Sequence, residues 1–234
     1  MLLPIFHFSA MAVDAYAFWY DQTYVDLPFS NPLVKELPLK SRSMFLTMWC
    51  LILQITYHMI AFLNDVFGTN AASPKKKPTI RLIKDVLFSI AFPVAMYVSG
   101  TFWGIYAIDK DLIYPDYIAK LYPEWVNHVL HTTIAIFMFI ELLMTNRSYP
   151  SRKVGLSVMS TFIISYISFY LTVYFKTGTW AYPLFDELNW PLRIVFLLFS
   201  YLLVIAIYIL AEKINYIVTG SKTEKTLSGK QKKR

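Results

Sequence analysis

The chain has 234 residues, of which 56% are hydrophobic and only 16% are charged. A globular domain carries roughly 25% charged residues, so this composition excludes an ordinary soluble domain. The formal net charge is +7, but the basic residues lie at the ends of apolar runs and near the C-terminus. That distribution favours contact with an anionic membrane surface and no nucleic-acid partner. The single cysteine, Cys50, can form no internal disulfide and fits no zinc-ligand spacing.

Six segments are apolar and long enough to cross a bilayer, which takes about 20 helical residues. They are Leu2–Tyr20, Met44–Leu63, Val86–Ile108, Trp125–Thr145, Val154–Phe175 and Pro191–Ile217. The first has no basic leading region and no small-residue cleavage site, so we expect a retained helix rather than a removed signal peptide. We therefore predict an all-α polytopic membrane protein. A bundle of six transmembrane helices over residues 1–217 would precede a basic cytosolic tail over residues 218–234.

The distribution of Lys and Arg predicts the orientation of the bundle. Of the 22 basic residues, 15 lie in the connection after the second span, in the connection after the fourth span and near the C-terminus. Because basic connections favour the cytosol, we expect both termini there. Asn146 of the sequon Asn146-Arg147-Ser148 would then carry no glycan. The ending from Lys230 to Arg234 resembles a dilysine retrieval signal, although a polybasic tail that holds anionic lipid explains it equally well. We expect the protein to reside in the endoplasmic reticulum, the plasma membrane or both.

Two predicted helices carry polar residues on one face, at a rotation of 100° per residue. On the second span this face consists of Thr47, Leu51, Gln54 and His58. On the fourth span it consists of Asn127, His131, Ile134, Met138 and Glu141, with His128 to one side. Strongly polar groups within a span normally face the bundle interior or a cavity, so both faces should point inward.

Thr47 and His131 are predicted to lie at similar depth, near the non-cytosolic ends of their helices. Thr47 follows Met44 by about one turn, and His131 follows Trp125 by roughly 9 Å at a rise of 1.5 Å per residue. A hydroxyl attacks an acyl carbon only when a nearby base takes its proton, and histidine is the usual base. The alternative is structural, since membrane threonines often bond to their own helix and histidines often join helix contacts.

Four stretches follow one another in the second half of the chain: Tyr122–Thr132, Ser148–Leu156, Lys176–Pro183 and Glu212–Asn215. Through these stretches the chain resembles the androgen-induced and androgen-dependent TFPI-regulating membrane proteins. Looser matches are Phe45–Thr47 and Asp111–Pro115. The resemblance implies hydrolysis of fatty acid esters of hydroxy fatty acids by a threonine nucleophile and a histidine partner, in the positions of Thr47 and His131. The expected partners are the lipid ester and membrane lipids, with no cofactor and no metal. Protein partners are left open.

The reaction expected from this resemblance is acyl transfer to Thr47 with His131 as general base, followed by hydrolysis of the acyl-threonine. No Gly-x-Ser-x-Gly turn is present, so the donors that stabilise the oxyanion must lie elsewhere. Asn127, His128 and Gln54 are candidates, and each is explained equally well by helix contacts.

Two further residues could serve such a site. Asp14 could orient the histidine, and Arg193 could bind a substrate carboxylate or extend to the lipid headgroups. One alternative to an enzyme is a small transporter or channel, which the intramembrane polar residues and a kink at Pro93 would support. Another is a non-enzymatic scaffold. No inverted repeat supports transport.

Overall fold

The six predicted spans are helices in the computed structural model, which describes residues 2–71, 74 and 76–231, with only the backbone for 219–231. Five long helices are α1 (Leu2–Tyr24), α3 (Leu46–Phe67), α4 (Thr79–Ile108), α8 (Arg152–Thr177) and α10 (Trp190–Gln231). The remaining span consists of α6 (Glu124–His128), the π-helical turn η3 (Val129–Thr133) and α7 (Ile134–Met144). The described part of the chain contains no strand, which confirms the all-α fold.

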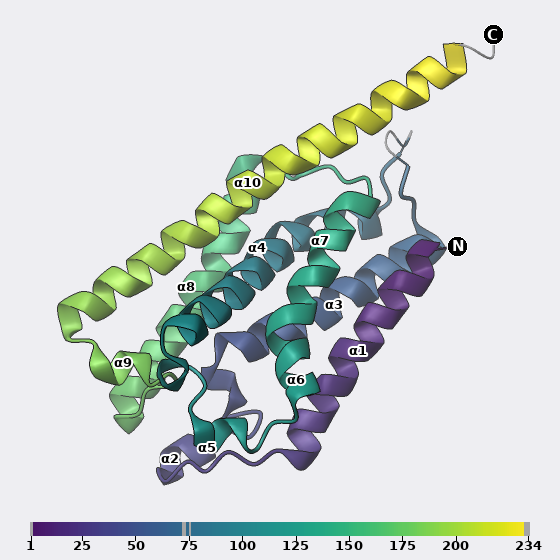
Figure 1. The fold of residues 1–234 in the computed structure, drawn as a ribbon. Helices are drawn as coiled ribbons and strands as arrows, with labels where there is room; N and C mark the ends of the chain where they lie inside the picture. Colours follow the sequence, from purple (N-terminus) through teal and green to yellow (C-terminus); the bar gives the residue numbers. More distant parts are fainter. Residues whose placement is uncertain (1, 72–73, 75, 232–234) are drawn as a thin grey trace.

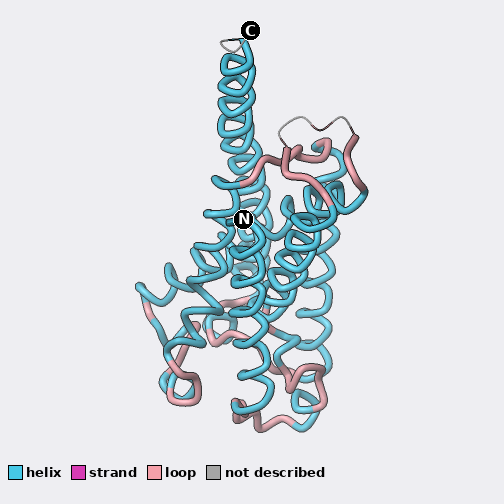
Figure 2. Tube along the Cα trace, turned by 90° about the vertical axis from the view of Figure 1, so that its right-hand side faces the viewer, coloured by secondary structure: helices cyan, strands magenta, loops and turns pink. Residues whose placement is uncertain are grey.

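The bundle has two different ends (Figure 1). Connections 25–45, 109–123 and 178–189 form what we call the pocket end. It holds the short helices α2 (Pro32–Lys35), η1 (Arg42–Met44), η2 (Lys110–Leu112), α5 (Asp116–Ala119) and α9 (Leu184–Glu187). The start of α1 and connections 68–78 and 145–151 form the terminal end, beyond which α10 continues (Figure 2).

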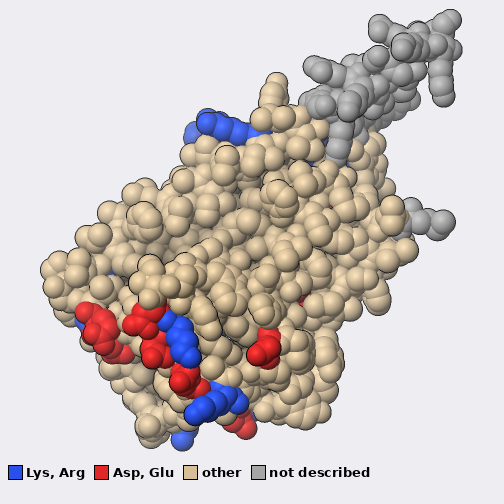
Figure 3. Space-filling model, viewed as in Figure 1, with Lys and Arg blue, Asp and Glu red and all other residues tan. Residues whose placement is uncertain are grey.

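The lateral surface of the bundle is apolar. Figure 3 shows Lys, Arg, Asp and Glu gathered at the two ends, with an uncharged belt between them. The outward face of α10 alone exposes Ile194, Val195, Leu198, Phe199 and Leu202. A soluble protein rarely exposes such a continuous apolar surface, whereas a bilayer requires it. The chain is therefore a multi-pass membrane protein with six helices long and apolar enough to cross a membrane.

Two helices extend furthest beyond the spans that hydropathy predicts. Helix α4 begins at Thr79 rather than Val86, because Arg81, Lys84 and Asp85 in its first turns are buried and paired instead of solvated. Helix α10 continues past Ile217 to Gln231. The division of the chain at residue 217 stays a prediction, and residues 232–234 of the dilysine-like ending lie outside the described residues.

A buried cluster of charges around Glu141 joins the helices at the terminal end. The Glu141 carboxylate accepts a hydrogen bond from His7 at 2.8 Å and lies 3.3 Å from both Lys84 and Arg147. His7 also bonds Asp65 at 2.6 Å. The cluster links α1, α3, α4 and α7 to the connection after α7, so it fixes how the helices pack around the pocket.

Candidate active site

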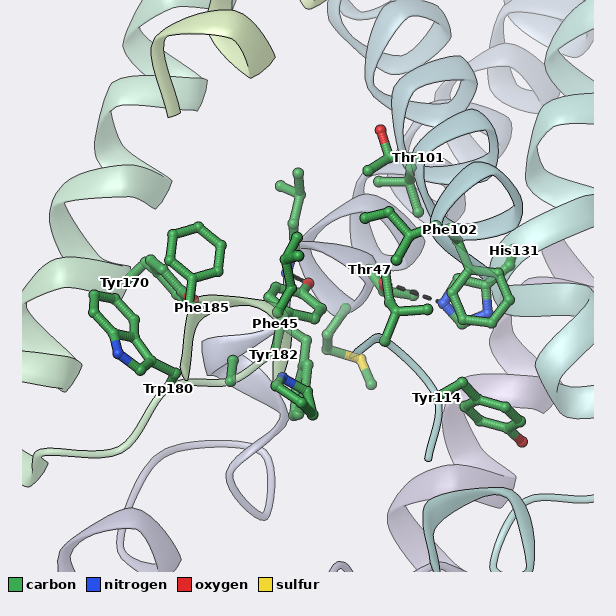
Figure 4. A pocket seen from close by; sticks show the side chains of 18 of the residues that line it. Phe45, Thr47, Thr101, Phe102, Tyr114, His131, Tyr170, Trp180, Tyr182 and Phe185 are labelled. Carbon is green, nitrogen blue, oxygen red and sulfur yellow. Dashed lines mark hydrogen bonds between the residues drawn. The ribbon is translucent and has the colours of Figure 1, made fainter. Parts of the chain in front are cut away.

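A cavity of about 350 Å³ lies near the pocket end of the bundle. Its walls are the start of α3, the second half of α4, the junction of α6 and η3, the middle of α8, the first half of α10 and the three connections of the pocket end. Most of the side chains that line it are aliphatic or aromatic. Figure 4 shows Tyr170, Trp180 and Phe185 on one side of the cavity, with Phe102 and His131 on the other. Its volume suits a small apolar ligand or part of a lipid chain.

Thr47 and His131 point toward one another in this cavity (Figure 4). The Thr47 Oγ lies 3.3 Å from the His131 Nε2. Thr47 is half-buried, and His131 is 8% exposed. The two side chains that the sequence predicts at similar depth in the membrane are thus hydrogen-bonded in the structure. A hydroxyl and an imidazole nitrogen in contact are the arrangement that transfers a proton from a nucleophile to a base.

Asn127 fixes which nitrogen of His131 faces Thr47. The His131 Nδ1 lies 2.9 Å from the Asn127 Oδ1 and 3.1 Å from the Asn127 main-chain oxygen. Both partners are acceptors, so Nδ1 carries the proton and Nε2 presents its lone pair to Thr47. Asn127 is thus the third, orienting member of a Thr–His–Asn arrangement. The sequence pattern made Asn127 one of three candidate donors to the oxyanion, because helical spacing alone does not distinguish an amide that orients the histidine from one that donates to the substrate.

The His131 ring is also held by its neighbours and its backbone. Its centroid lies 3.6 Å from that of Phe102, with 9° between the ring planes. The Trp103 Nε1 donates to the His131 main-chain oxygen at 3.1 Å. That oxygen is available because His131 lies in the π-helical turn η3, where the regular backbone bonding changes. Such turns are frequent at functional sites, and no sequence pattern predicted this one.

A strained segment places Thr47 at the start of α3. Leu39, Lys40 and Ser41 all have left-handed backbone, with φ of 57°, 49° and 73°. Each such non-glycine residue costs of order 1–3 kcal/mol and persists only where the surroundings impose it. Here the buried Arg42 imposes it, since its Nε donates to Asp21 at 3.2 Å and its Nη2 to the Val25 oxygen at 2.7 Å.

Two tyrosine hydroxyls lie at the same helix start. The Leu46 N–H donates to the Tyr182 hydroxyl at 3.0 Å and to the Tyr166 hydroxyl at 3.1 Å. The Thr47 side chain also lies near the Tyr182 hydroxyl. Burial raises the pKa of Tyr182 to about 12, so its hydroxyl stays protonated at neutral pH. Sequence analysis did not assign Tyr182, although the family-specific stretch Lys176–Pro183 contains it.

The structure confirms that both polar faces point inward, but it brings only part of them to the cavity. Gln54 donates to the Ala91 oxygen at 3.0 Å, in the packed core. His128 is exposed and bonds Thr132 at 3.2 Å. Asp14 is fully buried, and neither carboxylate oxygen has a hydrogen-bond partner among the described residues, so it does not orient His131. Gln54 and His128, two of the candidates for oxyanion donors, are therefore not among the residues that line the cavity.

Arg193 does not reach the cavity as a free cation. Its Nε donates to the Phe185 oxygen at 2.9 Å, and its guanidinium lies 4.9 Å from the Trp180 ring centroid and 5.2 Å from that of Trp190. This cation–π packing closes the pocket end. Within the described residues, no three His, Cys, Asp or Glu side chains converge as a metal site requires.

Comparison with known proteins identifies the family. The model of the FAR-17a/AIG1-like proteins matches residues 3–216. Androgen-dependent TFPI-regulating protein from Mesocricetus auratus is 36% identical over 89% of this chain and 93% of the relative. The Homo sapiens protein of that name is 33% identical over 91% of each chain, and human androgen-induced gene 1 protein is 33% identical over 81% of this chain and 82% of its own. No solved structure gave a significant match. The chain belongs to the FAR-17a/AIG1-like family.

Proposed function

We propose that this protein is a membrane-embedded ester hydrolase that cleaves fatty acid esters of hydroxy fatty acids, with Thr47 as nucleophile and His131 as general base. The observation that carries the proposal is the 3.3 Å contact between the Thr47 Oγ and the His131 Nε2 inside an apolar cavity. A structural threonine would bond its own helix, as Thr56 does to the Ile52 oxygen at 2.8 Å. Thr47 bonds the histidine of another helix instead.

In the first half of the reaction, the Thr47 Oγ attacks the ester carbonyl carbon as its proton passes to the His131 Nε2. The tetrahedral intermediate then collapses with cleavage of the bond to the alcohol oxygen. That oxygen takes the proton from His131 and leaves as the hydroxy fatty acid. Asn127 accepts a hydrogen bond from Nδ1 throughout, which stabilises the imidazolium that forms between the two proton transfers.

In the second half, water gives a proton to the His131 Nε2 and attacks the acyl-threonine carbon. Collapse of this intermediate returns the proton to the Thr47 Oγ and releases the fatty acid. Thr47 is the second residue of α3, so the ester carbonyl would lie at the positive end of that helix. The dipole of a helix favours negative charge at this end.

An apolar cavity between transmembrane helices suits a substrate with long hydrocarbon arms. Ile163 and Ile167 of α8 and Leu197 and Val204 of α10 line it on the side toward the membrane interior. Leu27, on the connection after α1, lines it toward the pocket end. Two chains that diverge from one ester could occupy these two directions. The family resemblance adds the identity of the ester, which the cavity alone does not specify.

The proposal includes an orientation and a compartment. Since the connections at the terminal end are rich in Lys and Arg, both termini would be cytosolic and Thr47 would lie in the opposite leaflet. The endoplasmic reticulum, the plasma membrane or both would contain the protein.

Purified protein in liposomes tests the activity directly. Wild type should release fatty acid from the lipid ester, and Thr47→Ala and His131→Ala should abolish the release while their unfolding temperatures stay close to that of wild type. Thr56→Ala and His128→Ala are matched controls on the same two spans, since Thr56 is half-buried, His128 is exposed and neither lines the cavity. Equal hydrolysis by all five proteins would refute the nucleophile and base. No hydrolysis by wild type would refute the proposed activity and favour a transporter or a scaffold.

A further inference from the structure

We propose that the Tyr182 hydroxyl is the hydrogen-bond donor that stabilises the oxyanion formed when Thr47 attacks an ester. This inference rests on the proposed function, and it assigns a catalytic residue outside the six spans.

The position of Tyr182 meets the first requirement, which is closeness to the reacting oxygen. Tyr182 lines the cavity, and its hydroxyl accepts the Leu46 N–H at 3.0 Å, one residue before the nucleophile. The Thr47 side chain lies near the same hydroxyl. His131 approaches Thr47 from α6–η3–α7, whereas Tyr182 approaches from the connection after α8 (Figure 4). A carbonyl attacked by Thr47 would therefore have the base and the phenol on different sides.

The second requirement is a proton that points to the substrate. The Leu46 N–H is shared between the hydroxyls of Tyr166 and Tyr182, and Tyr166 donates its own proton to the Met44 oxygen at 3.1 Å. Tyr182 accepts from Leu46 in the same way, but no main-chain oxygen of the described residues accepts its proton. The hydroxyls of Tyr166 and Tyr182 are neighbours, and rotation of the Tyr182 hydroxyl would direct its proton to the oxyanion during reaction. The N–H bond received from Leu46 polarises the phenol and strengthens it as a donor.

The third requirement is a donor held in place before the reaction. The Tyr182 ring packs edge-on against Phe45, with 5.5 Å between centroids and 83° between planes. The connection that carries Tyr182 is tied to α2 by Asn31, whose Nδ2 donates to the Thr177 oxygen at 2.7 Å. No bond forms or breaks at Tyr182, which contributes only a hydrogen bond that strengthens as the carbonyl oxygen becomes negative.

Other polar groups of the cavity are less suited to this role. The Thr101 and Ser200 side chains bond the hydroxyl of Tyr97. Asn127 is engaged with His131 through its side-chain oxygen. Tyr166 lines the cavity at the same helix start, but it donates its proton to the Met44 oxygen, so we assign the role to Tyr182.

The test is Tyr182→Phe, measured in liposomes with the lipid ester. The phenyl ring preserves the packing on Phe45, so we expect kcat to fall about 10²- to 10³-fold, as for loss of one oxyanion donor, with KM little changed. The matched control is Tyr149→Phe, at the terminal end, because the Tyr149 hydroxyl is buried and has no partner among the described residues. This control should keep the wild-type kcat.

A binding measurement separates a catalytic role from a structural one. A trifluoromethyl ketone analogue of the ester would add to Thr47 and create the oxyanion, whereas an ether analogue would not. Tyr182→Phe should weaken the ketone about 10²-fold or more and leave the affinity for the ether unchanged. An unchanged kcat together with unchanged ketone affinity would overturn the role of Tyr182, while an active wild type would keep the proposed function intact. Inactive wild type would instead refute the proposed function.

If Tyr182→Phe does not fold, a fluorinated tyrosine at position 182 preserves the shape of the side chain. Its more acidic phenol should move the alkaline fall of kcat to lower pH than in wild type. The titratable groups that face Tyr182 are Tyr166, Tyr97 and Tyr170. None of these three is fluorinated in the variant. A pH profile that matches wild type would contradict the proposal.

Discussion

Replacing Asn127 tests whether a side-chain amide orients the base. Asn127→Ala removes the Oδ1 acceptor at 2.9 Å from the His131 Nδ1 but keeps the main-chain oxygen at 3.1 Å. A neutral hydrogen bond contributes about 1 kcal/mol net, which corresponds to about a fivefold fall in kcat. The fall is small because the remaining acceptor still selects the tautomer with its proton on Nδ1. Loss of the tautomer would have a far larger effect, since the wrong tautomer of a triad lowers kcat by about 10⁴.

The assay is ester hydrolysis in liposomes, with kcat and KM measured separately and the unfolding temperature recorded. Asn127→Asp is the matched variant, because a carboxylate of the same shape still accepts the Nδ1 proton and should retain more activity than alanine. A folded Asn127→Ala protein with wild-type kcat would show that the amide does not orient His131. A fall of 10³ or more would show that the main-chain oxygen alone cannot hold the tautomer.

Three further predictions concern stability and topology. Glu141→Gln should lower the free energy of unfolding by about 3–5 kcal/mol, because it leaves buried cations unpaired. Glu212→Gln, at a more exposed ion pair, should change that free energy by less than about 1 kcal/mol. Equal effects of the two substitutions in thermal unfolding would contradict the role of the cluster. Gly155→Ala places a Cβ against the Tyr208 hydroxyl and should lower the free energy of unfolding by about 1–3 kcal/mol. Adding Tyr208→Phe should restore part of this loss. Purely additive effects of the two substitutions would refute this packing. Asn146 should carry no glycan in cells, and a glycan found there by mass spectrometry would reverse the orientation.

The fold was largely predictable because a bilayer imposes a strong and simple constraint. Six apolar runs became six helices, and the errors fell where charge is buried by pairing. Hydropathy placed the start of the third span at Val86 rather than Thr79, because it does not register that Lys84 pairs with Glu141 at 3.3 Å. Pairing between residues far apart in sequence is a tertiary property.

The candidate site was predictable only in part, for the same reason. Helical periodicity and depth brought Thr47 and His131 together, and the structure places them 3.3 Å apart. The same periodicity also pointed to Gln54, which the structure buries against the Ala91 oxygen, because a shared face does not specify a shared partner. Tyr182 lies in a connection, where no periodicity applies.

Covalent labelling tests the central claim most directly. A lipid-like fluorophosphonate that mimics the ester should react with the activated nucleophile, and peptide mass spectrometry locates the adduct. We predict an adduct on the Thr47 Oγ in wild type, none on the corresponding peptide of Thr47→Ala, and much slower labelling of His131→Ala. Labelling of a different residue, or full inhibition with Thr47 unmodified, would contradict the assignment of Thr47 as the nucleophile.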